Sequence, residues 1–139
     1  MNTLNNKVKE IFHEGILHAI IISQDWQPAK TEFLTSPELN MQLGSICYRK
    51  DDSITPHRHL DYERKINGTS ECLIVQKGEC FMDLYDSSNS LFDTHILKKG
   101  MIVLLYGGAH GFRMIEDTTF IEIKQGPFVL EQDKKRFNA

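Results

Sequence analysis

Two histidines separated by one residue are the first feature of the chain that could carry chemistry. His57 and His59 lie in the segment Pro56-His-Arg-His. In a β-strand, residues i and i+2 face the same side, so both imidazoles would point one way and Arg58 the other. Two imidazoles on one face can share a metal ion at distances of about 2.0–2.1 Å. The segment therefore predicts part of a metal site.

Two further residues could complete such a site from neighbouring strands. Glu71 opens a strand-like run and offers a carboxylate, and His110 follows the turn Gly107-Gly108 and offers a third imidazole. Three histidines and one carboxylate suit a divalent ion such as Fe, Mn, Ni or Zn, and nothing in the sequence selects among these metals. Each residue alone has an ordinary structural explanation, so the prediction depends on the four together.

Short strand-like runs separated by turn signals must position these side chains. Turn residues such as Lys77-Gly78 and Lys99-Gly100 separate the runs. Their spacing is typical of an antiparallel sandwich or barrel. We expect an all-β fold closed into a barrel, because so many strands would otherwise leave open edges. Helical periodicity is confined to the first dozen residues. The expected strands are 16–23, 41–48, 71–76, 79–86, 93–97, 101–106, 111–115 and 119–124.

The order of these motifs resembles that of the cupin superfamily. The first motif runs from Pro56-His57-x-His59 to Glu71, followed by six residues and Gly78. The second leads from Gly100 to Tyr106-Gly-Gly-Ala-His110. The resemblance is good over residues 54–126 and looser over the whole chain.

The resemblance implies a fold and a set of ligands. The fold would be a single cupin domain over residues 1–139, which is a double-stranded β-helix or jelly-roll barrel. Residues 1–40 would form N-terminal strands or an extension, and residues 131–139 a polar tail. One divalent metal ion would be bound by the two histidines of the first motif, its glutamate and the last histidine. These ligands are His57, His59, Glu71 and His110.

The sequence departs from the cupin pattern at three places. Eleven residues separate His59 from Glu71, where the family places its glutamate three or four residues on. Glu63 has the shorter spacing, but no glycine lies seven residues beyond it, so Glu71 is preferred. Tyr106 stands at the proline of the second motif, and Met114 at the expected asparagine. Catalytic residues of the family are therefore not carried over to this chain.

Polar residues on otherwise apolar strands are candidates to bind a substrate. The interior of a barrel is lined by alternate strand residues, so any of them that faced inward would lie beside a metal. Strand alternation also puts half of such positions in solvent. For 119–124, the sequence leaves open which face is inward. The candidates are Tyr48, Arg113, Glu122 and Lys124.

Composition narrows the class of protein. The 139 residues suit one domain. The net charge of −3, with 16 basic and 19 acidic residues, argues against nucleic acid as a partner. No apolar stretch approaches the ~20 residues of a membrane span, and no secretory signal is recognised, so a cytoplasmic protein is expected. The odd cysteine count and the absence of CxxC favour reduced thiols.

Two functions remain open. The first is a metal-dependent enzyme acting on a small polar metabolite, as a sugar or sugar-nucleotide isomerase or epimerase in carbohydrate metabolism, or as an oxygenase of a small carboxylate. The second is a non-catalytic cupin that binds or senses a small ligand. The resemblance also implies a homodimer, for which the isoleucine-rich run at 16–22 offers an apolar surface.

Overall fold

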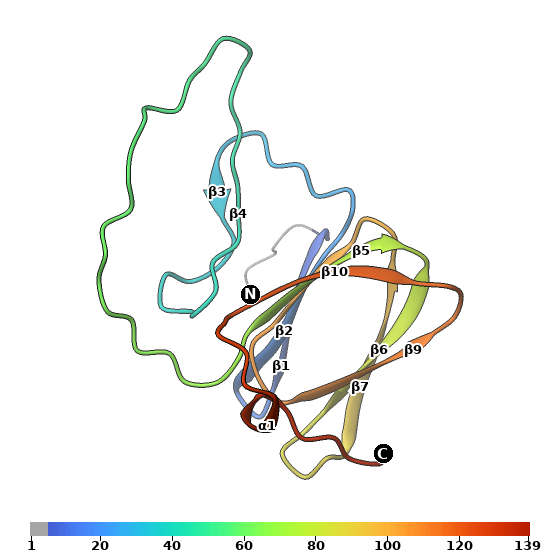
Figure 1. Cartoon of the computed structure of the whole chain (residues 1–139). Helices are drawn as coiled ribbons and strands as arrows, with labels where there is room; N and C mark the ends of the chain where they lie inside the picture. Colours follow the sequence, from blue (N-terminus) through green and yellow to red (C-terminus); the bar gives the residue numbers. More distant parts are fainter. Residues whose placement is uncertain (1–5) are drawn as a thin grey trace. The chain divides into compact units, whose positions relative to one another are not determined.

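The computed structural model describes residues 6–139, which divide between two compact units (Figure 1). The larger unit combines the chain up to Trp26 with Thr69–Ala139, and the smaller unit is Gln27–Gly68. Regular structure in the described residues consists of antiparallel strands and one four-residue helix. The expectation of a β-rich fold is therefore confirmed.

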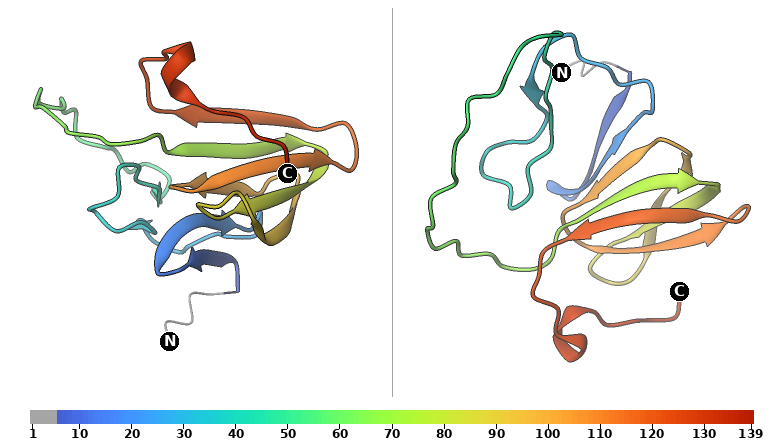
Figure 2. Two further views of the ribbon diagram at one scale, coloured as in Figure 1. Left: turned by 90° about the horizontal axis from the view of Figure 1, so that it is seen from below. Right: turned by 45° about the horizontal axis from the view of Figure 1, so that its top comes forward.

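The larger unit contains two antiparallel sheets. The five-stranded sheet has the order β1 (Val8–His13), β2 (Ile16–Ile22), β8 (Ile102–Leu105), β5 (Glu71–Lys77) and β10 (Thr119–Lys124). The three-stranded sheet has the order β7 (Leu91–Lys98), β6 (Glu79–Tyr85) and β9 (Ala109–Met114). Helix α1 (Leu130–Asp133) follows β10, and Figure 2 shows this helix between β10 and the tail. The smaller unit contains the short pair β3 (Glu32–Phe33) and β4 (Gly44–Ser45).

One hydrophobic core lies between the inner faces of the two sheets of the larger unit. Alternate residues along each strand point into it, as the pleat of a strand requires. The five-stranded sheet contributes Ile11, Ala19, Ile21, Leu73, Val75, Val103 and Leu105. The three-stranded sheet contributes Cys80, Met82, Leu84 and Leu97. The two sheets therefore pack as a sandwich, with packing between side chains as the main contact.

Closure into a barrel is not found among residues 6–139. The pairing leaves β1 and β10 as the edges of the larger sheet, and β7 and β9 as the edges of the smaller. The two sheets are therefore not joined by hydrogen bonds between their edge strands. We call the two places where an edge of one sheet lies near an edge of the other the seams of the sandwich: one lies between β10 and β9, the other between β1 and β7.

Two expected elements are also corrected. The run 41–48 forms a strand only at Gly44–Ser45, because its other residues have no ladder partner in the described chain. The helical periodicity of the first dozen residues does not produce a helix in their described part, where Val8–His13 form the strand β1; residues 1–5 lie outside the described residues. β1 pairs with β2 from Val8↔Ile22 to His13↔Ile16, and burial of Val8 and Ile11 against its neighbours outweighs the weak helical periodicity.

A buried carboxylate is held on the outer side of the three-stranded sheet. Asp83 is 3% exposed and accepts hydrogen bonds from Arg113 Nε at 2.6 Å and Nη2 at 2.9 Å. Thr94 Oγ1 donates a third at 2.8 Å. The Arg113 hydrogen bonds lower the pKa of Asp83, and they outweigh the opposing effect of burial. The three residues join β6, β7 and β9.

This pairing predicts a pH-dependent stability. Because the folded pKa of Asp83 is depressed, its stabilising contribution is complete above the ordinary carboxyl pKa of about 4 and is lost as the pH falls through the folded value. We expect Asp83→Asn to lower the urea midpoint at pH 7, and the deficit relative to wild type to shrink toward about pH 2. The exposed Asp117→Asn variant is the control and should show no such trend. A deficit for Asp83→Asn that stays constant with pH would refute the assignment.

Gly108 lies where a side chain cannot be accommodated. Its φ is +68°, a left-handed conformation that favours glycine, and an added Cβ would overlap the ring of His18. Gly15, in the β1–β2 turn, has φ of +76° with no atom near an added Cβ. The two glycines share backbone strain but differ in steric surroundings.

Alanine at each position separates these two effects. Gly15→Ala should cost about 1–2 kcal/mol of unfolding free energy, from backbone strain alone. Gly108→Ala should cost at least about 1 kcal/mol more, because the methyl group also displaces the buried His18 ring. Chemical denaturation of both variants measures the difference, and equal losses would show that His18 does not restrict this position.

Candidate functional site

Glu71 and His110 meet between the two sheets of the larger unit. Glu71 is the first residue of β5 and shares the inner face of that strand with Leu73 and Val75. His110 shares the inner face of β9 with Phe112, which packs on the core. Glu71 Oε2 lies 3.2 Å from His110 Nε2, and the side chains are 14% and 29% exposed, respectively. Strand alternation thus brings two of the four predicted ligands together.

The edge strand β10 adds two charged side chains to this site. Lys124 pairs with Glu71 in the register of β10 and β5, and Glu122 pairs with Leu73. Phe120, on the same side of β10, packs on the core and contacts Phe112. Glu122 and Lys124 therefore belong to the inner side of the strand, the question that the sequence left open.

The opposite side of β10 carries the isoleucines. Ile121 is 44% exposed and Ile123 is 56% exposed. The more apolar set of β10 side chains thus faces away from the core. The desolvation cost of placing Glu122 and Lys124 on the inner side is offset by the pairing of charges at this edge of the sheet.

The surroundings of Glu71 favour its ionised form. The hydrogen bond with His110 is the main cause of a lowered pKa, and it outweighs the raising effect of burial. A side-chain hydrogen bond with Glu122 and the positive charge of Lys124 lower this pKa further. Glu71 is thus a deprotonated carboxylate at neutral pH, which is the form that can bind a metal ion or accept a hydrogen bond.

Lys124 links this site to the C-terminal segment. Its Nζ lies 3.3 Å from Asp133 Oδ2 in α1 and 5.0 Å from the centre of the Phe128 ring. The hydrogen bond to Asp133 is the main reason why the pKa of Lys124 is raised. Further along the tail, Phe137 contacts Tyr85 with ring centres 5.3 Å apart.

The other two predicted ligands lie in the smaller unit. His57 and His59 are not in a strand, so the premise of their alternation in a strand is wrong. Their ring centres are nevertheless 5.3 Å apart, and His57 Nδ1 lies 2.9 Å from the Thr55 carbonyl oxygen. If Nδ1 carries the proton and donates to this carbonyl, His57 Nε2 is left as a lone-pair donor for a metal ion.

The remaining sequence candidates lie elsewhere. Tyr48 and Glu63 belong to the smaller unit, and both are exposed. Arg113 faces the outer side of β9, where it pairs with Asp83 and stacks over Phe81 with its Cζ 4.7 Å from the ring centre. Of the four substrate-binding candidates, the structure therefore brings Glu122 and Lys124 to the Glu71–His110 pair.

A second aromatic and histidine cluster was not anticipated from the sequence. His13 stacks on Phe92 with ring centres 4.1 Å apart, and His18 meets the edge of the same ring at 4.8 Å. His18 is 4% exposed and its Nδ1 has no hydrogen-bond partner within the described chain. Burial, and then the charge of His13, lower the pKa of His18. His18 is therefore neutral and acts as a packing group.

Among residues 6–139, no group of three or more His, Cys, Asp or Glu side chains is arranged to hold a metal ion. The predicted ligands form one pair in each unit, Glu71 with His110 in the larger and His57 with His59 in the smaller. Comparisons with protein-family models, with curated proteins and with solved structures find no match to this chain. In the described part of the chain, no helix has the length and apolar character needed to cross a membrane.

The Lys124–Asp133 pair should control the order of α1. This helix has no side-chain N-cap and no buried residue, and four residues cannot sustain a helix without outside contacts. We expect Asp133→Asn to raise hydrogen exchange of residues 130–133 several-fold, while the strands of the core keep their protection. Glu131→Gln, in the same helix, is the matched control. Equal exchange in both variants would show that the ion pair does not hold the helix.

Proposed function

We propose that the chain is a metal-binding, cupin-type enzyme that acts on a small polar metabolite. The observation that carries this proposal is the contact between Glu71 and His110, beside Glu122 and Lys124, at one seam of the sandwich. A carboxylate, an imidazole, a second carboxylate and an ammonium group on adjoining strands form a set suited to binding and proton transfer. The cupin resemblance of the motifs is an independent support from the sequence.

The residues present fit a divalent metal ion in their chemistry. Glu71 is an ionised carboxylate, His110 turns Nε2 toward it, and His57 leaves Nε2 available when Nδ1 is bonded to Thr55. By the cupin resemblance of the sequence, these three residues and His59 would be the ligands of the ion. When bound, such an ion supplies a Lewis acid that polarises a carbonyl or hydroxyl group of a substrate.

Glu122 and Lys124 would bind and orient the substrate. The Lys124 ammonium keeps N–H donors beyond the one directed at Asp133, and these would bind a carboxylate or phosphate. Glu122 would accept hydrogen bonds from hydroxyl groups. A sugar, a sugar nucleotide or a small carboxylate meets these requirements. Isomerisation or epimerisation of a sugar and oxygenation of a small carboxylate are therefore the reactions to test.

The Glu71–His110 contact also supports a reaction that needs no metal. An imidazole hydrogen-bonded to a carboxylate can take up and return a proton, since the carboxylate orients the ring and stabilises its charged form. Isomerisation or epimerisation at a carbon beside a carbonyl needs a group of this kind. In this second candidate, His110 acts as the base and Glu71 positions it.

Metal content distinguishes the two candidates. If the chain binds metal through the proposed ligands, purified protein loaded with Fe, Mn, Ni or Zn should retain about one ion per chain after gel filtration. Glu71→Gln should lose most of this ion, because an amide is a much weaker metal ligand than a carboxylate. Glu63→Gln is the matched control and should retain it.

The histidine pair provides the second arm of this test. The double variant His57→Ala with His59→Ala should also lose the ion. Stoichiometric metal in that variant, or equal retention in both glutamate variants, would contradict the proposed ligand set. A wild-type protein that binds none of the four metals yet converts a substrate, with activity lost in His110→Gln, would support the metal-free reaction.

A further inference from the structure

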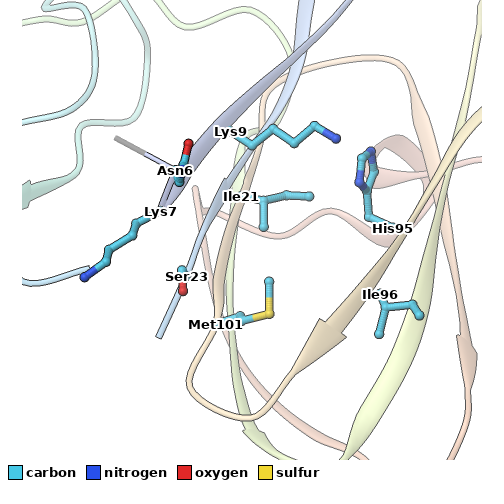
Figure 3. A pocket seen from close by; sticks show the side chains of 8 residues that line it. All are labelled: Asn6, Lys7, Lys9, Ile21, Ser23, His95, Ile96 and Met101. Atoms are coloured by element: carbon cyan, nitrogen blue, oxygen red, sulfur yellow. The ribbon is translucent and has the colours of Figure 1, made fainter. Parts of the chain in front are cut away.

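A pocket of about 220 Å³ lies at the other seam of the sandwich, between β1 and β2 on one side and β7 on the other (Figure 3). All of its residues belong to the larger unit and none belongs to the Glu71–His110 site. The volume is below the roughly 300–1,000 Å³ of pockets for drug-sized ligands, so it suits a small molecule. The lining residues are Asn6, Lys7, Lys9, Ile21, Ser23, His95, Ile96 and Met101.

Lys9 gives this pocket a positive charge with no partner in residues 6–139. It pairs with Ile21 in the register of β1 and β2, and Ile21 faces the core, so Lys9 lies on the inner side of the edge strand. Figure 3 shows its side chain extending toward the side of the pocket on which His95 lies. Lys7 is different, because its Nζ donates to the Asp25 carbonyl oxygen at 2.9 Å.

His95 is the second polar group of the pocket and is held in place. Its side chain is 13% exposed, and its Nε2 lies 2.8 Å from Asp93 Oδ2. The other oxygen of Asp93 accepts a hydrogen bond from the Thr94 backbone N–H at 2.9 Å. Asp93 is thus engaged by His95 and by the Thr94 backbone, and it makes no ion pair with Lys9 in the described residues.

The rest of the pocket is largely apolar. Ile21 is 6% exposed and belongs to the core, and Met101 packs against that core. Ile96 adds a further apolar side chain from β7. A cation above an apolar floor is the arrangement that holds an amphipathic anion, since the charged group and the hydrocarbon part are bound by different surfaces.

We propose that this pocket binds a small organic anion, with its carboxylate or phosphate held by Lys9 beside His95 and its short apolar part packed on Ile21 and Met101. The pocket is a binding site separate from the proposed active site. Its ligand class is set by the excess of positive charge and by the apolar floor.

Titration of the isotope-labelled chain with pentanoate, butyl phosphate and 1-butanol, which share a butyl chain, tests this site by NMR. At least one of the two anions should produce saturable shifts of the Ile21 and Met101 methyl signals and the His95 ring signals. The two anions differ only in the charged group and so identify the head group that the pocket prefers. Butanol, which lacks the charge, should bind at least about tenfold more weakly.

Single-residue variants show which side chains contribute to the affinity for the anion. Lys9→Gln should weaken binding of the preferred anion about tenfold or more, because one charge-assisted hydrogen bond is lost at an exposed strand position that tolerates glutamine. Lys77→Gln makes the same change of charge on β5 and should leave the affinity unchanged.

Three results would overturn the proposal. They are the absence of saturable shifts with both anions, equal affinity for butanol, and equal affinity in the Lys9→Gln and Lys77→Gln variants. None of these results depends on the metal content or the activity of the chain, so failure of this proposal is distinguishable from failure of the proposed function.

Discussion

The pairing register of β5 is the constraint on which both the core and the proposed active site depend. β5 lies between β8 and β10, with Leu73 opposite Val103 on one side and Glu122 on the other. A slip of one residue would turn Glu71 outward and bring Cys72 to the inner face, because successive side chains of a strand alternate. The burial of Leu73 and Val75 therefore fixes the position of Glu71 as well.

The open sandwich explains where the polar groups gather. The middle of the core is formed by side chains such as Met82, Leu84 and Val103, which are at most 1% exposed. Polar and charged groups occur at the two seams, where edge strands leave the inner face accessible to water. One seam carries the Glu71–His110 pair beside β10, and the other carries Lys9 and His95 between β1 and β7. Closing both seams would remove the access of ligands to the Glu71–His110 site and to the Lys9–His95 pocket.

Much of the fold was predictable from the sequence, because it depends on local patterns. Strand-like runs on either side of the Lys77-Gly78 turn predict two strands, and the structure contains them as β5 and β6, which belong to different sheets. The inner face of β10 was not predictable, since isoleucine on the solvent side imitates a core pattern. The motifs predicted that Glu71 and His110 belong to one site. The direct contact between them depends on the strand registers, which the sequence alone does not give.

Two features escaped prediction for physical reasons. His57 and His59 lie outside regular structure, so alternation in a strand gave no basis for their orientation. The His18 cluster depends on a register shift between β1 and β2, next to Ile11 and Phe12, and a single strand carries no sign of such a bulge. The first miss concerns a segment without regular structure and the second a tertiary contact, and residue spacing alone encodes neither.

A double-mutant cycle of Glu71→Gln and His110→Gln measures the central contact most directly. Residues in contact are energetically coupled, whereas distant residues contribute additively. If the register of β5 places these side chains as described, the unfolding free energies of the single and double variants should show a coupling of at least about 0.5 kcal/mol. Losses that add to within about 0.3 kcal/mol would contradict the contact and the proposed site built on it.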